Sequence, residues 1–146
     1  MNRLWRIAHW LILKKRGGGI RSLGRILELT NHIICGCSIS ASADIGKGTI
    51  FFHRGIGCVI HPGAKIGENC QIFQNVTIGS KWSEGVCKGE APRIGDGVLI
   101  GAGAVVLGDI SIGNNVIIGA NAVVLNDIPA NSYAVGIPAK IRKREV

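Results

Sequence analysis

An aliphatic residue recurs at every sixth position over a long stretch of this 146-residue chain. The recurring residues are Ile60, Ile66, Ile72 and Ile78, followed after a gap by Ile94, Ile100, Val106, Ile112, Ile118 and Val124. A small or branched residue stands four positions after nine of them, at Ala64, Cys70, Val76, Val98, Ala104, Ile110, Val116, Ala122 and Ile128. A period of six matches neither the 3.6 of an amphipathic helix nor the 2 of an ordinary strand.

We interpret each hexad as one short β-strand followed by one corner of a solenoid. The aliphatic side chain points inward, the small residue fills the corner, and the glycine that often follows the aliphatic residue permits a close turn. Three hexads complete a triangular coil of about 18 residues, so that equivalent residues stack in columns. Because each coil can bury its aliphatic residues only against its neighbours, the repeat predicts an all-β solenoid. Aromatic residues make up only 5% of the chain, so its core must be mainly aliphatic.

The first interruption of the repeat lies just before Ile60. Phe51 keeps the step of six from the residues upstream, but Ile60 follows it by nine, so three extra residues are accommodated around His53. Departures from a regular pattern are often functional. His53 is therefore a candidate general base, with a merely polar corner residue as the alternative. His61 lies inside a regular hexad, where a solvent-facing polar residue is ordinary, and we expect it to be dispensable.

The second interruption separates Ile78 from Ile94 by sixteen positions, which leaves ten extra residues. The segment 79–93 is rich in Gly, Ser, Lys and Glu and is expected to leave the solenoid as a loop. The interruptions and charges together divide the chain into three parts. These are an N-terminal basic helical segment (1–37), the solenoid with its loop (38–135) and a C-terminal tail (136–146).

The net charge of +8 is concentrated at the two ends of the chain. Residues 1–37 carry +6 and residues 140–146 carry +3, whereas residues 38–139 sum to −1. Proteins that bind nucleic acid usually gather basic residues on one folded face, so we expect no nucleic-acid partner. Anionic lipid or phosphorylated ligands fit this distribution better.

The N-terminal segment has the pattern of two short amphipathic helices separated by three glycines. Apolar residues fall on one face of residues 3–16, and a second helix from about Ser22 would turn Ile26 and Ile33 inward. We expect this hairpin to cap the open end of the solenoid. A basic surface that touches an anionic membrane is a compatible alternative. The apolar run near Trp10 is far shorter than the roughly 20 residues needed to span a bilayer.

The five cysteines predict no disulfide framework. Their number is odd, and Cys35 and Cys37 are too close in sequence for an ordinary bridge. Cys58 and Cys70 occupy positions where the repeat places small apolar residues. Buried thiols in a reducing compartment follow from this, and no secretory signal is visible. We therefore expect a cytoplasmic protein, with the inner face of the cytoplasmic membrane as an added location.

The span from Ser38 to Lys140 resembles the catalytic domain of serine acetyltransferases, and more closely the shorter serine acetyltransferase-like enzymes that acetylate sugars. The likeness rests on the segments "KGTIFFH", "VIHPGAKIGENCQIFQNVTIG", "RIGDGVLIGAGAVVLGDISIGNNVIIGANAVV" and "SYAVGIPAK". This resemblance implies a left-handed parallel β-helix, although the general rule for parallel crossovers favours the right hand. It also implies acetyl-CoA as co-substrate, no metal, and a homotrimer whose cofactor groove lies between adjacent subunits.

The resemblance implies roles for individual residues as well. His53 closes the segment in which this family carries its catalytic base. The backbone N–H of Gly79 or Ser80 is the expected oxyanion donor. The pantetheine arm is expected along the flat glycine and alanine positions, the adenine at the "GIPAK" tail, and the phosphates near basic side chains. The implied cofactor-binding residues are Ser80, Lys81, Arg93, Gly101, Ala102, Ala120, Pro138 and Lys140.

The chain departs from the serine enzymes at the positions that would hold an amino acid. An Asp that precedes the catalytic His in those enzymes is Phe52 here, and another Asp fifteen residues earlier is Ser38. Their Arg-His pair in the loop is replaced by Glu90 and Ala91. We therefore expect the acceptor to be a sugar hydroxyl of a cell-surface polysaccharide precursor, with Phe51 and Phe52 stacking on the ring. L-Serine is the alternative acceptor.

Two other classes of protein share this type of prism. A metal-dependent carbonic anhydrase would need three converging histidines, and the repeat carries only His53 and His61. A non-catalytic solenoid is the remaining alternative. The broken hexad, the long loop and the cofactor-like tail argue against it.

Overall fold

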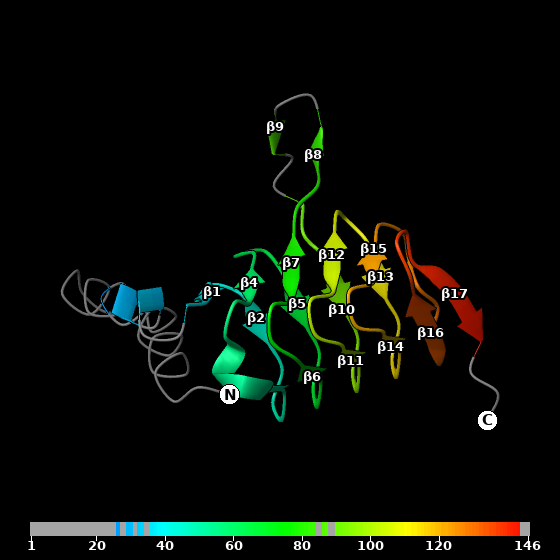
Figure 1. Cartoon of the computed structure of the whole chain (residues 1–146), viewed down its shortest axis with the longest axis horizontal. Helices are drawn as coiled ribbons and strands as arrows, with labels where there is room; N and C mark the ends of the chain where they lie inside the picture. Colours follow the sequence, from blue (N-terminus) through cyan, green and yellow to red (C-terminus); the bar gives the residue numbers. More distant parts are fainter. Residues whose placement is uncertain are drawn as a thin grey trace.

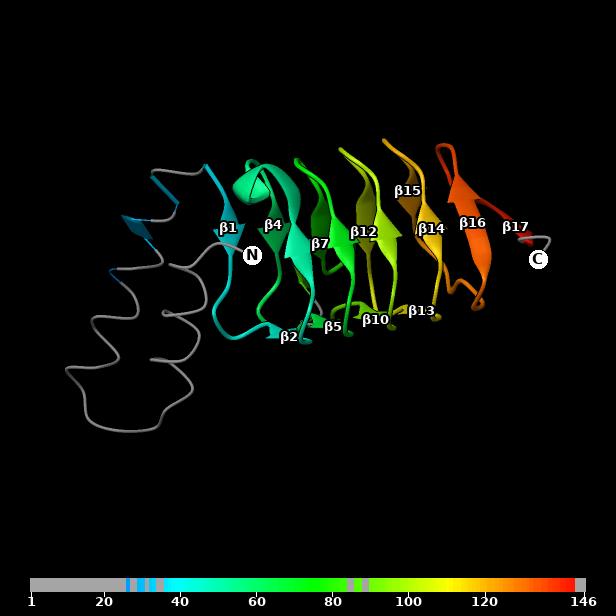
Figure 2. The same cartoon turned by 90° about the horizontal axis from the view of Figure 1, so that it is seen from below.

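Short strands wind into three parallel sheets that form the faces of a triangular prism (Figure 1, Figure 2). The computed structural model describes residues 26, 29–30, 32–33, 36–83, 86–87 and 90–143. Face 1 consists of β1 (Ser38–Ile39), β4 (Val59–Ile60), β7 (Thr77–Gly79), β12 (Val105–Leu107) and β15 (Val123–Val124). Face 2 consists of β2 (Asp44–Ile45), β5 (Lys65–Ile66), β10 (Arg93–Ile94) and β13 (Ser111–Ile112). Face 3 consists of β3 (Ile50–Phe51), β6 (Gln71–Ile72), β11 (Leu99–Ile100), β14 (Ile117–Ile118), β16 (Ser132–Val135) and β17 (Lys140–Lys143).

The columns predicted from the repeat form the core of the prism. On face 2, for example, Ile94 of β10 lies in parallel register between Ile66 of β5 and Ile112 of β13. Each of the ten aliphatic repeat residues is at most 5% exposed, and the nine small or branched corner residues are at most 7% exposed. The residues that alternate with them, such as Lys65 and Arg93, point outward. The predicted solenoid is confirmed.

The glycines have a different role from the one expected. The glycine after the aliphatic residue is required because adjacent coils approach closely: a Cβ on Gly67 would lie 2.6 Å from the carbonyl carbon of Gly95. The left-handed corner conformation falls two positions later, where Gly97 has φ +65°. Asparagine occupies the same corner position in other coils, for example Asn115 with φ 58°, since Asn tolerates this conformation better than most residues.

The two interruptions of the repeat leave the prism at different edges. After β3, the 3₁₀ helix η1 (Phe52–Gly55) accommodates the three extra residues where face 3 turns into face 1. After β7, the antiparallel hairpin of β8 (Trp82–Ser83) and β9 (Val86–Cys87) projects from the edge between faces 1 and 2. Figure 1 shows this hairpin and the short green helix η1 on opposite sides of the prism. The predicted loop therefore contains strands of its own.

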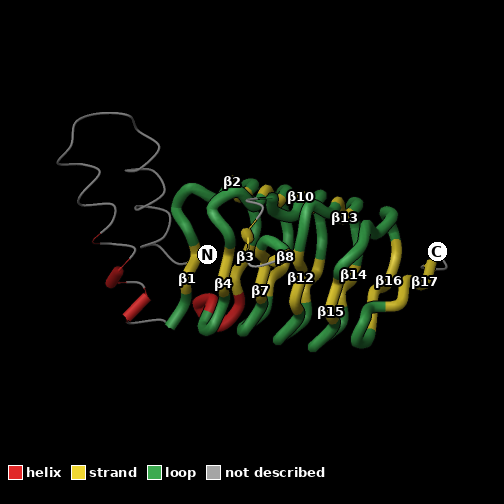
Figure 3. Tube along the Cα trace, turned by 90° about the horizontal axis from the view of Figure 1, so that it is seen from above, coloured by secondary structure: helices red, strands yellow, loops and turns green. Residues whose placement is uncertain are grey.

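The two ends of the described chain differ. At the C-terminal end β17 folds back antiparallel on β16, and Figure 3 shows it at the far end of the stack from β1. Most of the N-terminal segment lies outside the described residues, including its first predicted helix. Positions 26, 29–30 and 32–33 are helical, but Ile26 and Ile33 are exposed in the single chain, contrary to the expectation that both face inward. Among the described residues, no helix is long and apolar enough to cross a membrane.

Three described cysteines have free thiols and are buried, as expected. They are Cys37, Cys58 and Cys70, whereas Cys35 and Cys87 lie outside the residues whose side chains are described. The thiols of Cys58 and Cys70 donate to the carbonyl oxygens of Phe73 and Gly95, each at 3.2 Å. Burial raises the pKa of both thiols, because desolvation disfavours the thiolate.

Candidate active site

A groove of about 680 Å³ lies on face 1, at the root of the projecting hairpin. Its floor is formed by outward side chains of successive coils, among them Val59 of β4, Thr77 of β7 and Leu107 of β12. β7 lies in parallel register between β4 and β12, so that Val59 pairs with Thr77 and Leu107 pairs with Gly79. Polar residues also line this groove, at Ser38, Ser40, His61, Ser80 and Lys81.

His61 is half-buried and lines this groove. Its backbone N–H donates to the carbonyl of Ile78 at 2.8 Å, which attaches it to the coil that carries Gly79. The backbone N–H of Gly63 donates to its Nδ1 at 3.0 Å and fixes the ring. His61 thus lines the groove from a corner of a regular hexad, and the expectation that it is dispensable stays a prediction. The signal was present in the sequence, because His61 and Gly79 are eighteen positions apart and so occupy the same corner of adjacent coils.

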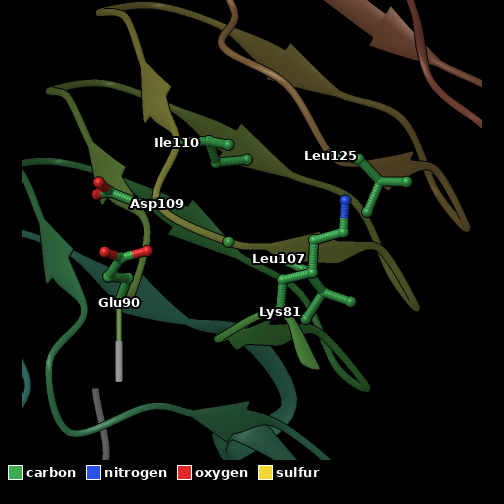
Figure 4. A pocket seen from close by; sticks show the side chains of 7 residues that line it. Lys81, Glu90, Leu107, Asp109, Ile110 and Leu125 are labelled. Carbon is green, nitrogen blue, oxygen red and sulfur yellow. The ribbon is translucent and has the colours of Figure 1, made fainter. Parts of the chain in front are cut away.

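A second cavity of about 320 Å³ shares Lys81, Leu107 and Leu125 with this groove. The second cavity is lined by Glu90, Asp109 and Leu125 in addition to Lys81. Figure 4 shows the Lys81 nitrogen pointing toward Leu125, with the Glu90 and Asp109 carboxylates together on the other side. The two cavities therefore differ in charge, and Lys81 belongs to both.

Arg93 forms an ion pair with Asp109 at 2.9 Å. Both side chains are exposed, at 59% and 41%, so solvent screens the pair and it adds little stability. Arg93, which is one of the residues expected at the cofactor phosphates, is thus already paired with the carboxylate of Asp109.

His53 lies on another edge of the prism and does not line either cavity. It is exposed, within η1, with a left-handed backbone of φ 51°. Beside it the ring of Phe52 stacks on that of Phe73, with centroids 4.5 Å apart and planes within 10°. Phe51 is only 4% exposed, so the prediction that it offers surface to a sugar ring is wrong. Strand alternation turns Phe51 inward and leaves Phe52 and Phe73 on the outside.

The structure brings together some of the predicted site residues and separates others. Gly79, Ser80 and Lys81 line one groove. His53 is at the start of the arc that crosses face 1, and Gly79 is at the end of that arc one coil further on. The width of face 1 separates these two edges. A single chain thus does not bring the candidate base to the candidate oxyanion donor.

The expected cofactor track lies along the later coils. A Cβ on Gly101 would stand 2.5 Å from the backbone nitrogen of Ala120, so the coils are closely packed there and the surface stays flat. Ala102 is half-buried and Ala120 is exposed on this surface. Pro138 and Lys140 are exposed beyond it in the tail. Among the described residues, no group of three or more His, Cys, Asp or Glu side chains is placed to hold a metal ion.

Comparison with known proteins identifies the repeat and the fold. The family model described as bacterial transferase hexapeptide (six repeats) matches residues 91–126. A serine acetyltransferase of Staphylococcus xylosus is 44% identical over 140 residues, which are 95% of this chain and 61% of that protein. Soybean serine acetyltransferase complexed with serine has a TM-score of 0.83 and 40% identity, covering 95% of this chain and 54% of that one.

A further solved structure, a serine acetyltransferase in complex with CoA, has a TM-score of 0.81 and 34% identity, covering 95% of this chain and 54% of that one. The chain thus spans 54% to 61% of the length of these relatives. The ten hexads, the three parallel faces and these likenesses agree with one another. The chain is similar to serine acetyltransferases over 95% of its length, and its fold is the left-handed parallel β-helix of those structures.

Proposed function

We propose that this protein transfers an acetyl group from acetyl-CoA to a hydroxyl. The observation that carries the proposal is the groove at Gly79, Ser80 and Lys81, in a chain whose relatives are serine acetyltransferases, one of them solved with CoA. Supporting it, the close-packed coils at Gly101 and Ala120 leave a flat track for the pantetheine arm. The exposed Pro138 and Lys140 then stand at the adenine end.

The reaction needs no covalent enzyme intermediate. His53 takes the proton of the acceptor hydroxyl as the oxygen attacks the thioester carbonyl. A backbone N–H of Gly79 or Ser80 donates to the oxyanion that forms, a contact worth about 3 kcal/mol in comparable sites. The C–S bond then breaks, and the CoA thiolate leaves with the proton that His53 holds.

We infer a homotrimer in which His53 of one copy faces the groove of the next. Two observations support this arrangement. Within one chain His53 and Gly79 lie on different edges of face 1. Face 1 also exposes apolar side chains, including Val59 at 47% with Leu107 and Leu125 half-buried beside it, and such surfaces favour a partner.

L-Serine is the acceptor that the comparisons favour. Their names and the 40% identity to an enzyme complexed with serine outweigh the sequence departures that suggested a sugar. A sugar hydroxyl is the second candidate, supported by one observation. The Phe52–Phe73 stack is half-buried at the surface beside His53, and an aromatic face of that kind suits a sugar ring.

The test measures thiol release from acetyl-CoA with L-serine and with a panel of free sugars and glycan intermediates. We expect saturable, acceptor-dependent release with L-serine and a 10²–10⁴-fold loss in His53→Ala, with CoA binding retained. Release with a sugar alone would select the second candidate. Thiol release that no acceptor stimulates would contradict both.

A further inference from the structure

Among the described side chains, one buried polar atom has no hydrogen-bond partner. It is Oε1 of Gln74, a half-buried residue between β6 and β7. An unpaired buried acceptor is costly, and native proteins keep few of them. The backbone of Gln74 is nonetheless fixed, because its carbonyl oxygen accepts the N–H of Gly103 at 3.0 Å. The unpaired oxygen therefore belongs to a well-ordered place in the fold and calls for a reason.

The strand register locates Gln74 relative to the inserted turn of the preceding coil. Before that turn, Ile50 pairs with Gln71, which lies 21 positions later. After it, Val59 pairs with Thr77, which lies 18 positions later. The offset between the two coils thus falls by three within the turn, and Gln74 lies in the stretch of the next coil that the turn accompanies.

Two contacts place the insertion more closely. The ring of Phe52, just before the inserted residues, stacks on the ring of Phe73. The carbonyl oxygen of Ile56, just after them, accepts the N–H of Asn75 at 2.9 Å. Since Gln74 stands between Phe73 and Asn75, the inserted residues leave the first coil directly beside it.

The inserted residues are His53, Arg54 and Gly55, and their backbone forms a tight turn. All three have a left-handed conformation, with φ of 51°, 60° and 72°, which is unfavourable for residues other than glycine. The carbonyl oxygen of His53 accepts the N–H of Ile56 at 3.3 Å and closes the turn. Because neighbouring strands lie about 4.8 Å apart, the amide of Gln74 is within reach of an imidazole held in this turn.

We propose that Gln74 is a positioning residue for His53. Its Oε1 accepts the Nδ1–H of the imidazole, which leaves Nε2 to take the proton of the acceptor hydroxyl. This role rests on the proposed acetyl transfer, in which His53 is the base. The hydrogen bond at one ring nitrogen decides where the proton of a neutral imidazole lies, and a base of this kind is usually oriented by a third group. Ser38 and Phe52 offer no carboxylate for this purpose, and the amide oxygen supplies the acceptor without a charge.

The experiment reads the tautomer of His53 and needs no turnover. Nitrogen-15 NMR of the ring nitrogens is recorded on the whole chain at a pH where the imidazole is neutral, and His53→Ala assigns the signals. The variants are Gln74→Leu and the control Gln71→Leu, which changes the exposed glutamine of β6 in the same coil. We expect the hydrogen on Nδ1 in the wild type and in the control. Gln74→Leu should lose this preference.

The kinetics of thiol release with L-serine give a second readout. Gln74→Leu should lower kcat by about 10- to 100-fold, the loss seen when the partner that orients a metal-ligating histidine is removed. KM should change little, because Gln74 does not line the groove at Gly79. Gln74→Glu should restore most of kcat and move the acidic limb of the pH profile to higher pH, because a carboxylate beside the ring favours the imidazolium.

Tautomer and turnover separate this role from the proposed function. A hydrogen on Nδ1 that depends on Gln74 supports the role even if no acceptor is acetylated, and that failure would contradict the acetyl transfer alone. A wild-type imidazole with its hydrogen on Nε2, or a tautomer unchanged in Gln74→Leu, would overturn it. Gln74→Leu protein that differs from the wild type only in its urea midpoint, with the same kcat and pH profile, would make Gln74 a structural residue and also overturn it.

Discussion

A site shared between copies should regain activity when two inactive variants are mixed. His53→Ala removes the proposed base, and Gly79→Leu fills the groove. The second change is tolerated by the backbone, because a Cβ on Gly79 meets only the Cδ2 of Leu107, at 3.4 Å. Each variant alone should lose at least 10²-fold of turnover.

The magnitude follows from counting intact sites. In a cyclic trimer each site would take His53 from one copy and the groove from the next. Random mixing of the two variants in equal amounts leaves about one quarter of the sites with both wild-type halves. The mixture, unfolded together and refolded, should therefore recover about a quarter of wild-type turnover.

The assay is thiol release with L-serine, and native mass spectrometry reports whether mixed trimers have formed. A mixture of His53→Ala with wild type serves as the calibration and should retain about half of the sites. Mixed trimers that show no recovered activity would refute the shared site. They would mean that His53 and Gly79 act within one chain, or that one of them does not act.

Three other outcomes are expected. Ile100→Ala should lower the free energy of unfolding by about 2–5 kcal/mol, whereas Ile50→Ala at a 46% exposed position should change it little; urea titration of both variants compares them. The Cys70 thiol has a raised pKa in the folded protein. Its contribution to the free energy of unfolding is therefore fully present below the thiol pKa of the unfolded chain, about 8.5, and is lost as the pH rises further. Between pH 7 and pH 10 the urea midpoint of Cys70→Ala should therefore fall less than that of the wild type. An equal fall in the two proteins would contradict this. Deletion of residues 1–18 should leave CoA binding unchanged, because the cofactor track lies on the later coils; if this segment touches a membrane, the deletion should also abolish sedimentation with anionic vesicles, and unchanged sedimentation would assign it to capping alone.

The core of this protein was predictable because its period is strict. All ten aliphatic repeat residues are buried, because a strict step of six places each of them at the equivalent inward position of its strand. The reason for the glycines was not predictable, because contact between coils depends on the spacing of backbones. Only the coordinates show that a Cβ on Gly67 would meet Gly95.

The candidate site was predicted less completely than the core. Gly79, Ser80 and Lys81 were singled out because they begin the inserted segment, and they line one groove, while their roles stay predictions. His61 also lines this groove, which counting one coil of eighteen residues back from Gly79 predicts. The separation of His53 from that groove could not be read from the sequence, since it depends on which corner of the triangle each insertion leaves.

The reversed strand β17 has a consequence for assembly along the prism axis. A stack of parallel coils ends in unpaired backbone groups that could template another molecule end to end, as in a growing fibre. At face 3 that terminal position is occupied by β17, which runs antiparallel to β16 and is exposed along its whole length. Its outermost residues include Lys140, Arg142 and Lys143, whose like charges repel a second copy of the same end. The tail that is expected to meet the cofactor therefore also stops the winding from propagating between molecules.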